Sequence, residues 1–147
     1  MVKAKHVELI VLGGGPGGYA AAFYAASHGK KVMLVDSRDV LGGTCLNEGC
    51  IPSKALIHAT EVLHAAADAE SFGISFKDPK IDIKKLREWK NGIITKLNKG
   101  IATLCDKKKV TFVHGRGYFE DGKTLRVETQ KGQSFYSYDH CIIATGS

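Results

Sequence analysis

The chain has 147 residues, of which 44% are apolar and 24% charged, and this length suits one domain with a single hydrophobic core. Its apolar runs are far shorter than the about 20 residues of a membrane-spanning helix, so no membrane association is expected. The net charge of +6 does not predict nucleic-acid binding, because the cluster Lys107 to Lys109 suits a solvated helix end and no nucleic-acid-binding motif accompanies it.

The first third of the chain predicts a strand, a helix and a second strand. Its start, MVKAKHVELIVLGG, lacks the pattern of a signal or transit peptide, so we expect a cytoplasmic protein. Val7 to Leu12 is a short β-branched run, and the glycine break GGGPGG follows it. Tyr19 to His28 is alanine-rich and helical, and Lys31 to Asp36 reads as another strand. This succession is typical of a β-α-β unit.

Two longer helices and several short strands are expected in the remainder. Apolar residues recur at helical spacing in residues 55–70, and again from Ile83 to Leu104, where lysines occupy other faces. In the last third, short strand patterns alternate with turn signals at Asp121 and Lys131, and HCIIATGS follows. We therefore predict an α/β fold with a parallel sheet flanked by helices and a small antiparallel β-meander. A separate, buried parallel strand is expected after the meander.

A glycine motif lies between the first strand and the first helix. Gly13, Gly15 and Gly18 form G-x-G-x-x-G, and Asp36 ends the next strand. In dinucleotide sites these glycines allow a tight turn, the approach of backbone to a pyrophosphate, and close packing of helix on strand. The helix N-terminus favours the phosphates, and the acid accepts hydrogen bonds from the adenosine ribose. The motif predicts dinucleotide binding, although it does not separate NAD from FAD.

Two of the four cysteines, Cys45 and Cys50, lie close together before a predicted helix. A structural disulfide is disfavoured in the cytosol, and closing so short a loop gains little stability. A metal site would need further ligands that this spacing lacks. A redox pair remains, at a helix start where the dipole is expected to lower thiol pKa. Cys105 and Cys141 are expected to be packing thiols.

Three segments, GGGPGGYAAA, GGTCLNEGCIPSKAL and IIATGS, together resemble the N-terminal FAD segment of the pyridine nucleotide-disulfide oxidoreductases. Within that family, LNEGCIPSKAL is closer to dihydrolipoamide dehydrogenases than to glutathione reductases, and mercuric reductases remain an alternative. The resemblance covers essentially the whole chain. It implies a Rossmann-like FAD-binding domain, with residues 1–147 as its N-terminal segment. The NAD, central and dimer-interface domains would lie outside this chain.

The resemblance also implies roles for individual residues. Cys45 would be the interchange thiol, Cys50 would contact the flavin as a charge-transfer thiolate, and Lys54 would tune the flavin by its charge. Asp36 would bind the adenosine ribose. The other expected FAD contacts belong to the glycine motif, the segment before Cys45, a glycine in the meander and the A-T-G segment: Gly13, Gly15, Gly18, Gly42, Gly43, Thr44, Gly117, Ala144, Thr145 and Gly146.

The implied activity is oxidation of dihydrolipoamide to lipoamide through a Cys45–Cys50 disulfide and FAD, with transfer of hydride to NAD+ at a site outside this chain. The implied partners are lipoyl domains of E2 or H proteins and 2-oxoacid dehydrogenase complexes, with a homodimer as the intact form. We expect the chain alone to be inactive. A non-catalytic FAD-binding module is therefore a second hypothesis.

Three features qualify the resemblance. Asp36 stands where the family usually has glutamate, so the ribose contact would be made from a shorter side chain with the same acceptor chemistry. Glu48 lies between the two cysteines, where it would oppose a thiolate if it faced them, and we expect it on the solvent side. The catalytic histidine of the family lies in the interface domain. The six histidines of this chain are therefore expected to be structural or solvated.

Overall fold

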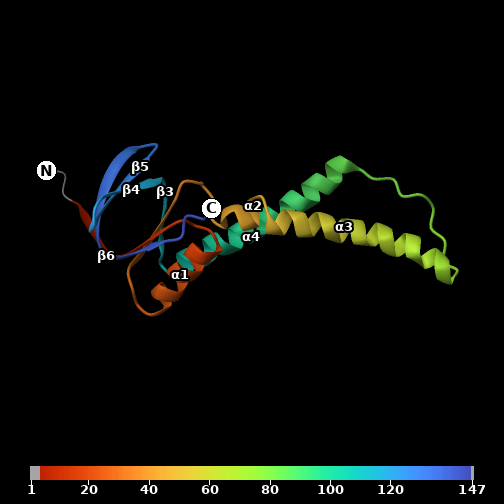
Figure 1. Cartoon of the computed structure of the whole chain (residues 1–147), viewed down its shortest axis with the longest axis horizontal. Coiled ribbons are helices and arrows are strands. Elements are labelled where there is room, and N and C mark those ends of the chain that lie inside the picture. The colour runs from red at the N-terminus through yellow and green to blue at the C-terminus, as the bar shows by residue number, and fades with distance from the viewer. Residues whose placement is uncertain (1–3, 147) are drawn as a thin grey trace.

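The computed structural model describes residues 4–146 and shows one six-stranded mixed sheet with helices against it (Figure 1). The strand order is β3-β2-β1-β6-β5-β4. Strands β1, β2, β3 and β6 run parallel to one another, whereas β4, β5 and β6 form an antiparallel meander. The predicted α/β fold is confirmed. The strand bounds are β1 (Lys5–Leu12), β2 (Val32–Asp36), β3 (Thr111–His114), β4 (Arg116–Asp121), β5 (Thr124–Thr129) and β6 (Gly132–Ile143).

The three predicted helices are present, but two of them begin earlier than expected, and a short helix over Gly43–Asn47 was not predicted. The first starts at Pro16 instead of Tyr19, because two glycines are accommodated in its first turn. The helix expected from residue 55 starts at Cys50, which places the second cysteine in its first turn. The bounds are α1 (Pro16–Ser27), α2 (Gly43–Asn47), α3 (Cys50–Asp68), the 3₁₀ helix η1 (Ala69–Phe72) and α4 (Ile83–Lys107).

The last strand of the sheet belongs to both of its parts. In β6, Gly132 to Ser137 pair antiparallel with β5, and Tyr136 to Ile143 pair parallel with β1. The expectation of a separate parallel strand after the meander is therefore wrong. One continuous strand of 12 residues makes both pairings: its first part has β5 as neighbour and its last part has β1. The meander is thereby joined directly to β1.

The hydrophobic core lies on both faces of the parallel strands. Neighbouring residues such as Ile10 and Val11 are both fully buried, as expected of central parallel strands covered on each face. On one face, Val11 packs with Phe23 of α1 and Cys105 of α4. On the other, Ile10 packs with Leu125 and residues of the meander. The described part of the chain thus has a helical layer, a sheet and the meander folded over the sheet.

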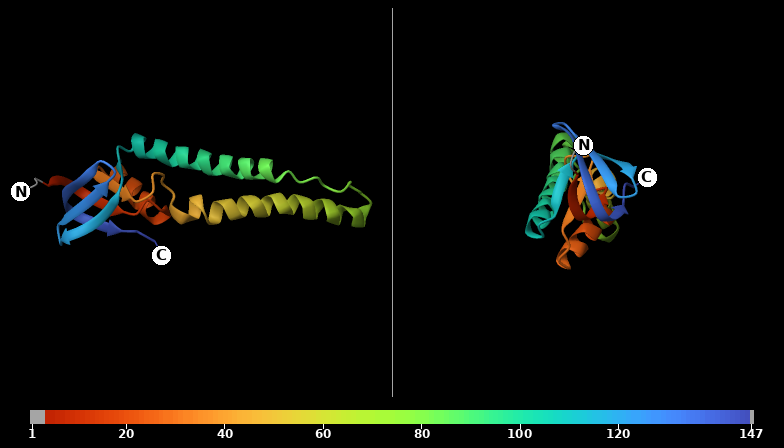
Figure 2. Two further views of the ribbon diagram at one scale, coloured as in Figure 1. Left: turned by 90° about the horizontal axis from the view of Figure 1, so that it is seen from above. Right: turned by 90° about the vertical axis from the view of Figure 1, so that its left-hand side faces the viewer.

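Helices α3 and α4 lie side by side and project away from the sheet (Figures 1 and 2). The chain passes between them through η1 and residues 73–82 at the far end of this pair. Asp82 caps the start of α4 by accepting a hydrogen bond from the backbone N–H of Lys85 at 3.1 Å. Among the described residues, no helix combines the length and apolar character needed to cross a membrane.

Candidate functional site

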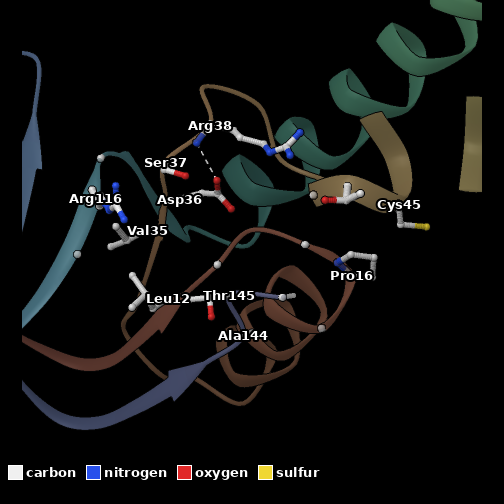
Figure 3. Close-up of a pocket in the computed structure, with 18 residues that line it drawn as sticks. Leu12, Pro16, Val35, Asp36, Ser37, Arg38, Cys45, Arg116, Ala144 and Thr145 are labelled. Carbon is white, nitrogen blue, oxygen red and sulfur yellow. Dashed lines mark hydrogen bonds between the residues drawn. The ribbon is translucent and has the colours of Figure 1, made fainter. Parts of the chain in front are cut away.

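The parallel strands end together at one edge of the sheet, and a cavity lies there (Figure 3). The chain leaves β1 toward β2 on one side, while β6 lies on the other side of β1. Ligands of open α/β sheets bind at such a reversal of strand order, beyond the carboxyl ends of the strands. The cavity has a volume of about 950 Å³, which is large enough for a sizeable organic ligand.

The glycine motif forms the turn between β1 and α1 at the floor of this cavity. Gly13 has φ +108°, a conformation that side chains with a Cβ rarely adopt. A Cβ on Gly13 would also collide with the backbone of Ala144. Gly18 lies in the first turn of α1, and a Cβ there would collide with the carbonyl oxygen of Gly13. The motif therefore allows the backbones of α1, the glycine turn and the segment that follows β6 to approach one another closely.

Asp36, the last residue of β2, is held by two backbone donors. Its Oδ1 accepts a hydrogen bond from the N–H of Arg38 at 2.7 Å (Figure 3). Its Oδ2 accepts one from the N–H of Gly14. An ionised carboxylate has about four acceptor positions, so two remain for further donors. The side chain lines the cavity beside the glycine turn. It can therefore accept hydrogen bonds from a pair of ligand hydroxyls.

A backbone contact joins α2 to the glycine turn. A Cβ on Gly43 would lie 2.7 Å from the Cα of Gly15, so the two backbones touch directly. The N–H of Gly42 donates to the carbonyl of Gly14 at 2.8 Å and ties the same two segments. Gly15 caps α1 without a side-chain hydrogen bond, which leaves the first N–H groups of the helix available to an anion. The residues present fit the pyrophosphate of a dinucleotide.

The two cysteines lie at the end of this cavity in adjoining helices. Cys45 is half-buried in α2 and lines the cavity, whereas Cys50 is exposed at the first position of α3. The hydrogen bond with the Cys50 thiol raises the pKa of Cys45 above its usual 9.0, burial raises it further, and the charge of Lys54 opposes both. The expectation of a lowered pKa is therefore wrong for Cys45, because the Cys50 thiol and burial raise the pKa more than the charge of Lys54 lowers it.

The structure gathers most of the predicted site residues around the cavity. Ten of them line it, namely Gly13, Gly15, Asp36, Gly43, Thr44, Cys45, Gly117, Ala144, Thr145 and Gly146. Four predicted residues do not line it, namely Gly18, Gly42, Cys50 and Lys54. Gly18 instead packs against the carbonyl oxygen of Gly13 in the turn, and Gly42 packs against Leu46 of α2. Cys50 is near enough to Cys45 for its thiol to raise the pKa of Cys45.

Sequence reasoning missed two arginines that line the cavity. Arg38 follows the acid of β2, and Arg116 begins β4 between two glycines (Figure 3). The guanidinium of Arg116 lies 5.8 Å from the ring centroid of Tyr118, and a second arginine, Arg126, lies 4.6 Å from the same centroid. The position of Arg38, two residues beyond the carboxyl end of a parallel strand, was the signal available in the sequence.

The remaining titratable residues lie away from the cavity. All six histidines of the chain are exposed, and none of them lines it. Cys105 is buried and Cys141 half-buried, and burial raises the pKa of both thiols, in agreement with packing roles. Glu48 is on the solvent side as expected, where it pairs with Arg38. Residues 4–146 contain no group of three or more side chains arranged to hold a metal ion.

Comparison with known proteins gives a consistent set of relatives. Residues 7–147 match the sequence profile of the family described as pyridine nucleotide-disulphide oxidoreductase. The chain is 49% identical over 143 residues to dihydrolipoyl dehydrogenase 2 of Haloarcula marismortui, covering 95% of this chain and 30% of that protein. It is 41% identical to the dihydrolipoyl dehydrogenase of Vibrio cholerae, covering 100% of this chain and 31% of that protein. The chain thus spans about a third of the length of these relatives.

Proposed function

The chain belongs to the pyridine nucleotide-disulphide oxidoreductase family, and we propose that it supplies the N-terminal FAD-binding segment and the redox-active cysteines of a dihydrolipoyl dehydrogenase. The observation that carries this proposal is the contact of α2 with the glycine turn, because it places Cys45 in the wall of the cavity that also contains Asp36. The names of the relatives favour this activity over that of a mercuric or glutathione reductase.

FAD suits the donors and acceptors of this cavity. The start of α1, with Gly15 and the N–H groups of Gly17 and Gly18, would hold the pyrophosphate, since the two glycines carry no side chain that would cover these donors. Asp36 would accept hydrogen bonds from the adenosine ribose with its remaining lone pairs. Thr44 and Cys45 would extend the site along α2, and Thr145 would close it from the end of β6. When bound, FAD would accept two electrons and pass them to NAD+.

The cysteine pair would perform thiol–disulfide exchange with dihydrolipoamide. A substrate thiolate attacks the sulfur of Cys45 in the oxidised pair, which forms a mixed disulfide and releases Cys50 as a thiolate. The second substrate thiol, after losing its proton to solvent or a base, then attacks the substrate sulfur of that mixed disulfide. This step closes the ring of lipoamide and releases Cys45. The substrate is oxidised by two electrons, which remain on the thiol pair.

The wider assembly follows from the same proposal. The substrate would arrive on the lipoyl domain of an E2 or H protein, as part of a 2-oxoacid dehydrogenase complex. Residues 1–147 would be the N-terminal segment of the FAD-binding domain, and the NAD site and a homodimer interface would be provided by other domains. A non-catalytic FAD-binding role is the second candidate for the chain by itself, because no histidine lines its cavity.

The decisive test is an anaerobic titration of the chain, reconstituted with FAD, with one equivalent of a dithiol while the visible spectrum is recorded. We expect a long-wavelength charge-transfer band that is lost in Cys50→Ser and kept in Cys45→Ser. Bound flavin without the band would favour the non-catalytic module. Failure to bind flavin, in a chain shown by circular dichroism to be folded, would contradict the proposed site.

A further inference from the structure

The segment between the two cysteines carries a carboxylate that thiol chemistry would not favour. Glu48 is three residues from Cys45 and two from Cys50. A negative charge near a thiol disfavours its thiolate, and the thiolate is the reactive form. The structure gives this carboxylate a dedicated partner, because Arg38 donates from Nη1 to Glu48 Oε1 at 2.7 Å and from Nη2 to Oε2 at 3.1 Å.

Hydrogen bonds fix the backbone of both residues of this ion pair. The N–H of Arg38 donates to Asp36 at 2.7 Å, and the N–H of Glu48 donates to the carbonyl of Thr44 at 2.9 Å. The Arg38 side chain is only 36% exposed, and it extends from the loop after β2 toward α2 (Figure 3). Two-point geometry on anchored residues distinguishes this pair from a typical surface salt bridge, in which two mobile side chains are ordered for little gain.

The Arg38–Glu48 ion pair also lies at a second, smaller cavity. A second cavity, of about 360 Å³, separates the loop after β2 from the end of α2, and Arg38 and Glu48 both line it. Besides the ion pair, the side chain of Asn47 reaches across to the carbonyl of Leu41 at 3.4 Å. The guanidinium therefore meets Glu48 beside a cavity that neither Cys45 nor Cys50 lines.

The charges around Cys45 come from a small number of elements. Lys54 of α3 is the charged residue that lowers the pKa of Cys45. The first turn of α1, Pro16 to Tyr19, contains no charged side chain. From α4, the contact with α2 is made by the neutral amide of Asn98, which donates to Asn47 at 2.9 Å. An unpaired carboxylate at position 48 would add one negative charge to the segment that joins the two cysteines.

We propose that Arg38 is a positioning residue of the redox segment, which holds Glu48 on its outer side and cancels its charge, so that the carboxylate does not oppose ionisation of the cysteines. The proposal rests on the redox role of Cys45 and Cys50 in the proposed function. It assigns to Arg38, two residues beyond the acid expected to bind the ribose, a task that is directed at the thiols and separate from the dinucleotide.

The test compares Arg38→Gln, Glu48→Gln and the double variant, using iodoacetamide alkylation of the reduced chain at neutral pH. Arg38→Gln leaves the carboxylate unpaired and should slow alkylation of the two cysteines about two- to threefold, the effect of one unit charge in a water-like dielectric. Glu48→Gln breaks the same contact without leaving a negative charge, so its rate should match or exceed that of the wild type. The double variant should return to the wild-type rate.

Lys30→Gln is a matched control, because it removes one positive charge and leaves Glu8 without the partner that it contacts at 3.3 Å far from the thiols. It should leave alkylation unchanged. Arg38→Lys should retain most of the wild-type rate, and high salt should reduce the Arg38→Gln effect.

Equal slowing by Arg38→Gln and Glu48→Gln would show a merely structural tie and overturn the proposal, as would an unchanged rate in Arg38→Gln. Because alkylation needs neither FAD nor substrate, failure of flavin binding or of the charge-transfer band would contradict the proposed function without altering this result.

Discussion

The contact of Gly43 with Gly15 makes a sharp prediction for the variant Gly43→Ala. Gly43 has φ +59°, which costs a residue with a Cβ roughly 1–2 kcal/mol. The added methyl would also lie 2.7 Å from the Cα of Gly15, and overpacking of this kind typically costs about 1–3 kcal/mol. Since a backbone atom cannot rotate away, the two effects should add. We expect a loss of about 2–5 kcal/mol in the free energy of unfolding.

Gly17→Ala is the matched control for this variant. Gly17 lines the same cavity, but a Cβ there has nothing within 4 Å, and its helical position favours alanine by up to about 1 kcal/mol. Urea unfolding of both variants, followed by circular dichroism, measures the difference, and flavin fluorescence quenching reports FAD affinity. Wild-type stability in Gly43→Ala, or equal losses in the two variants, would refute the proposed backbone contact between α2 and the glycine turn.

Three further outcomes are expected. Leu34→Ala empties a fully buried position of β2 and should lower the free energy of unfolding by about 3–5 kcal/mol in urea titrations, and a loss below 1 kcal/mol would contradict the core. The hydrogen bond with Arg38 lowers the pKa of Glu48 from its usual 4.5, so its stabilisation is present above that pH and lost in acid. The stability difference between wild type and Glu48→Gln should therefore vanish as the pH falls through the folded-state pKa, and a difference that persists in acid would exclude this ion pair as its cause. Cys50→Ala removes the thiol whose hydrogen bond is the main cause of the raised pKa of Cys45. The midpoint of Cys45 alkylation against pH should therefore move down toward 9.0, and an unchanged midpoint would exclude Cys50 as the cause.

The local parts of the fold could be predicted because their signals lie within short stretches of sequence. Strand β1, the glycine turn and Asp36 each follow from patterns a few residues long, and the resemblance added the cysteines. The sequence predicts too late a start for α1, because Gly17 and Gly18 are typical of a loop, whereas the close packing of Gly18 on Gly13 explains a glycine in the first turn of the helix. Helix preference alone does not reveal such a contact.

Relations between distant segments could not be predicted in the same way. The pairing of Arg38 with Glu48 joins two loops, and nothing in either loop alone indicates that the two side chains meet. The raised pKa of Cys45 depends on a hydrogen bond between neighbouring helices, which a general rule about helix dipoles does not capture. The continuity of β6 through the meander and the parallel sheet was missed because each half matches a different strand pattern.

The position of β6 beside β1 has a consequence for how the chain acquires its structure. The carbonyl of Leu12 accepts a hydrogen bond from the N–H of Ala144 at 2.7 Å, although the two residues are far apart in the sequence. During synthesis, β1 and β2 can pair early, but β1 keeps an open edge until β6 emerges. Such non-local pairing slows folding and exposes an unpaired strand to aggregation. We therefore expect the cavity to form late, and translation to be the interval in which this chain most needs protection by chaperones.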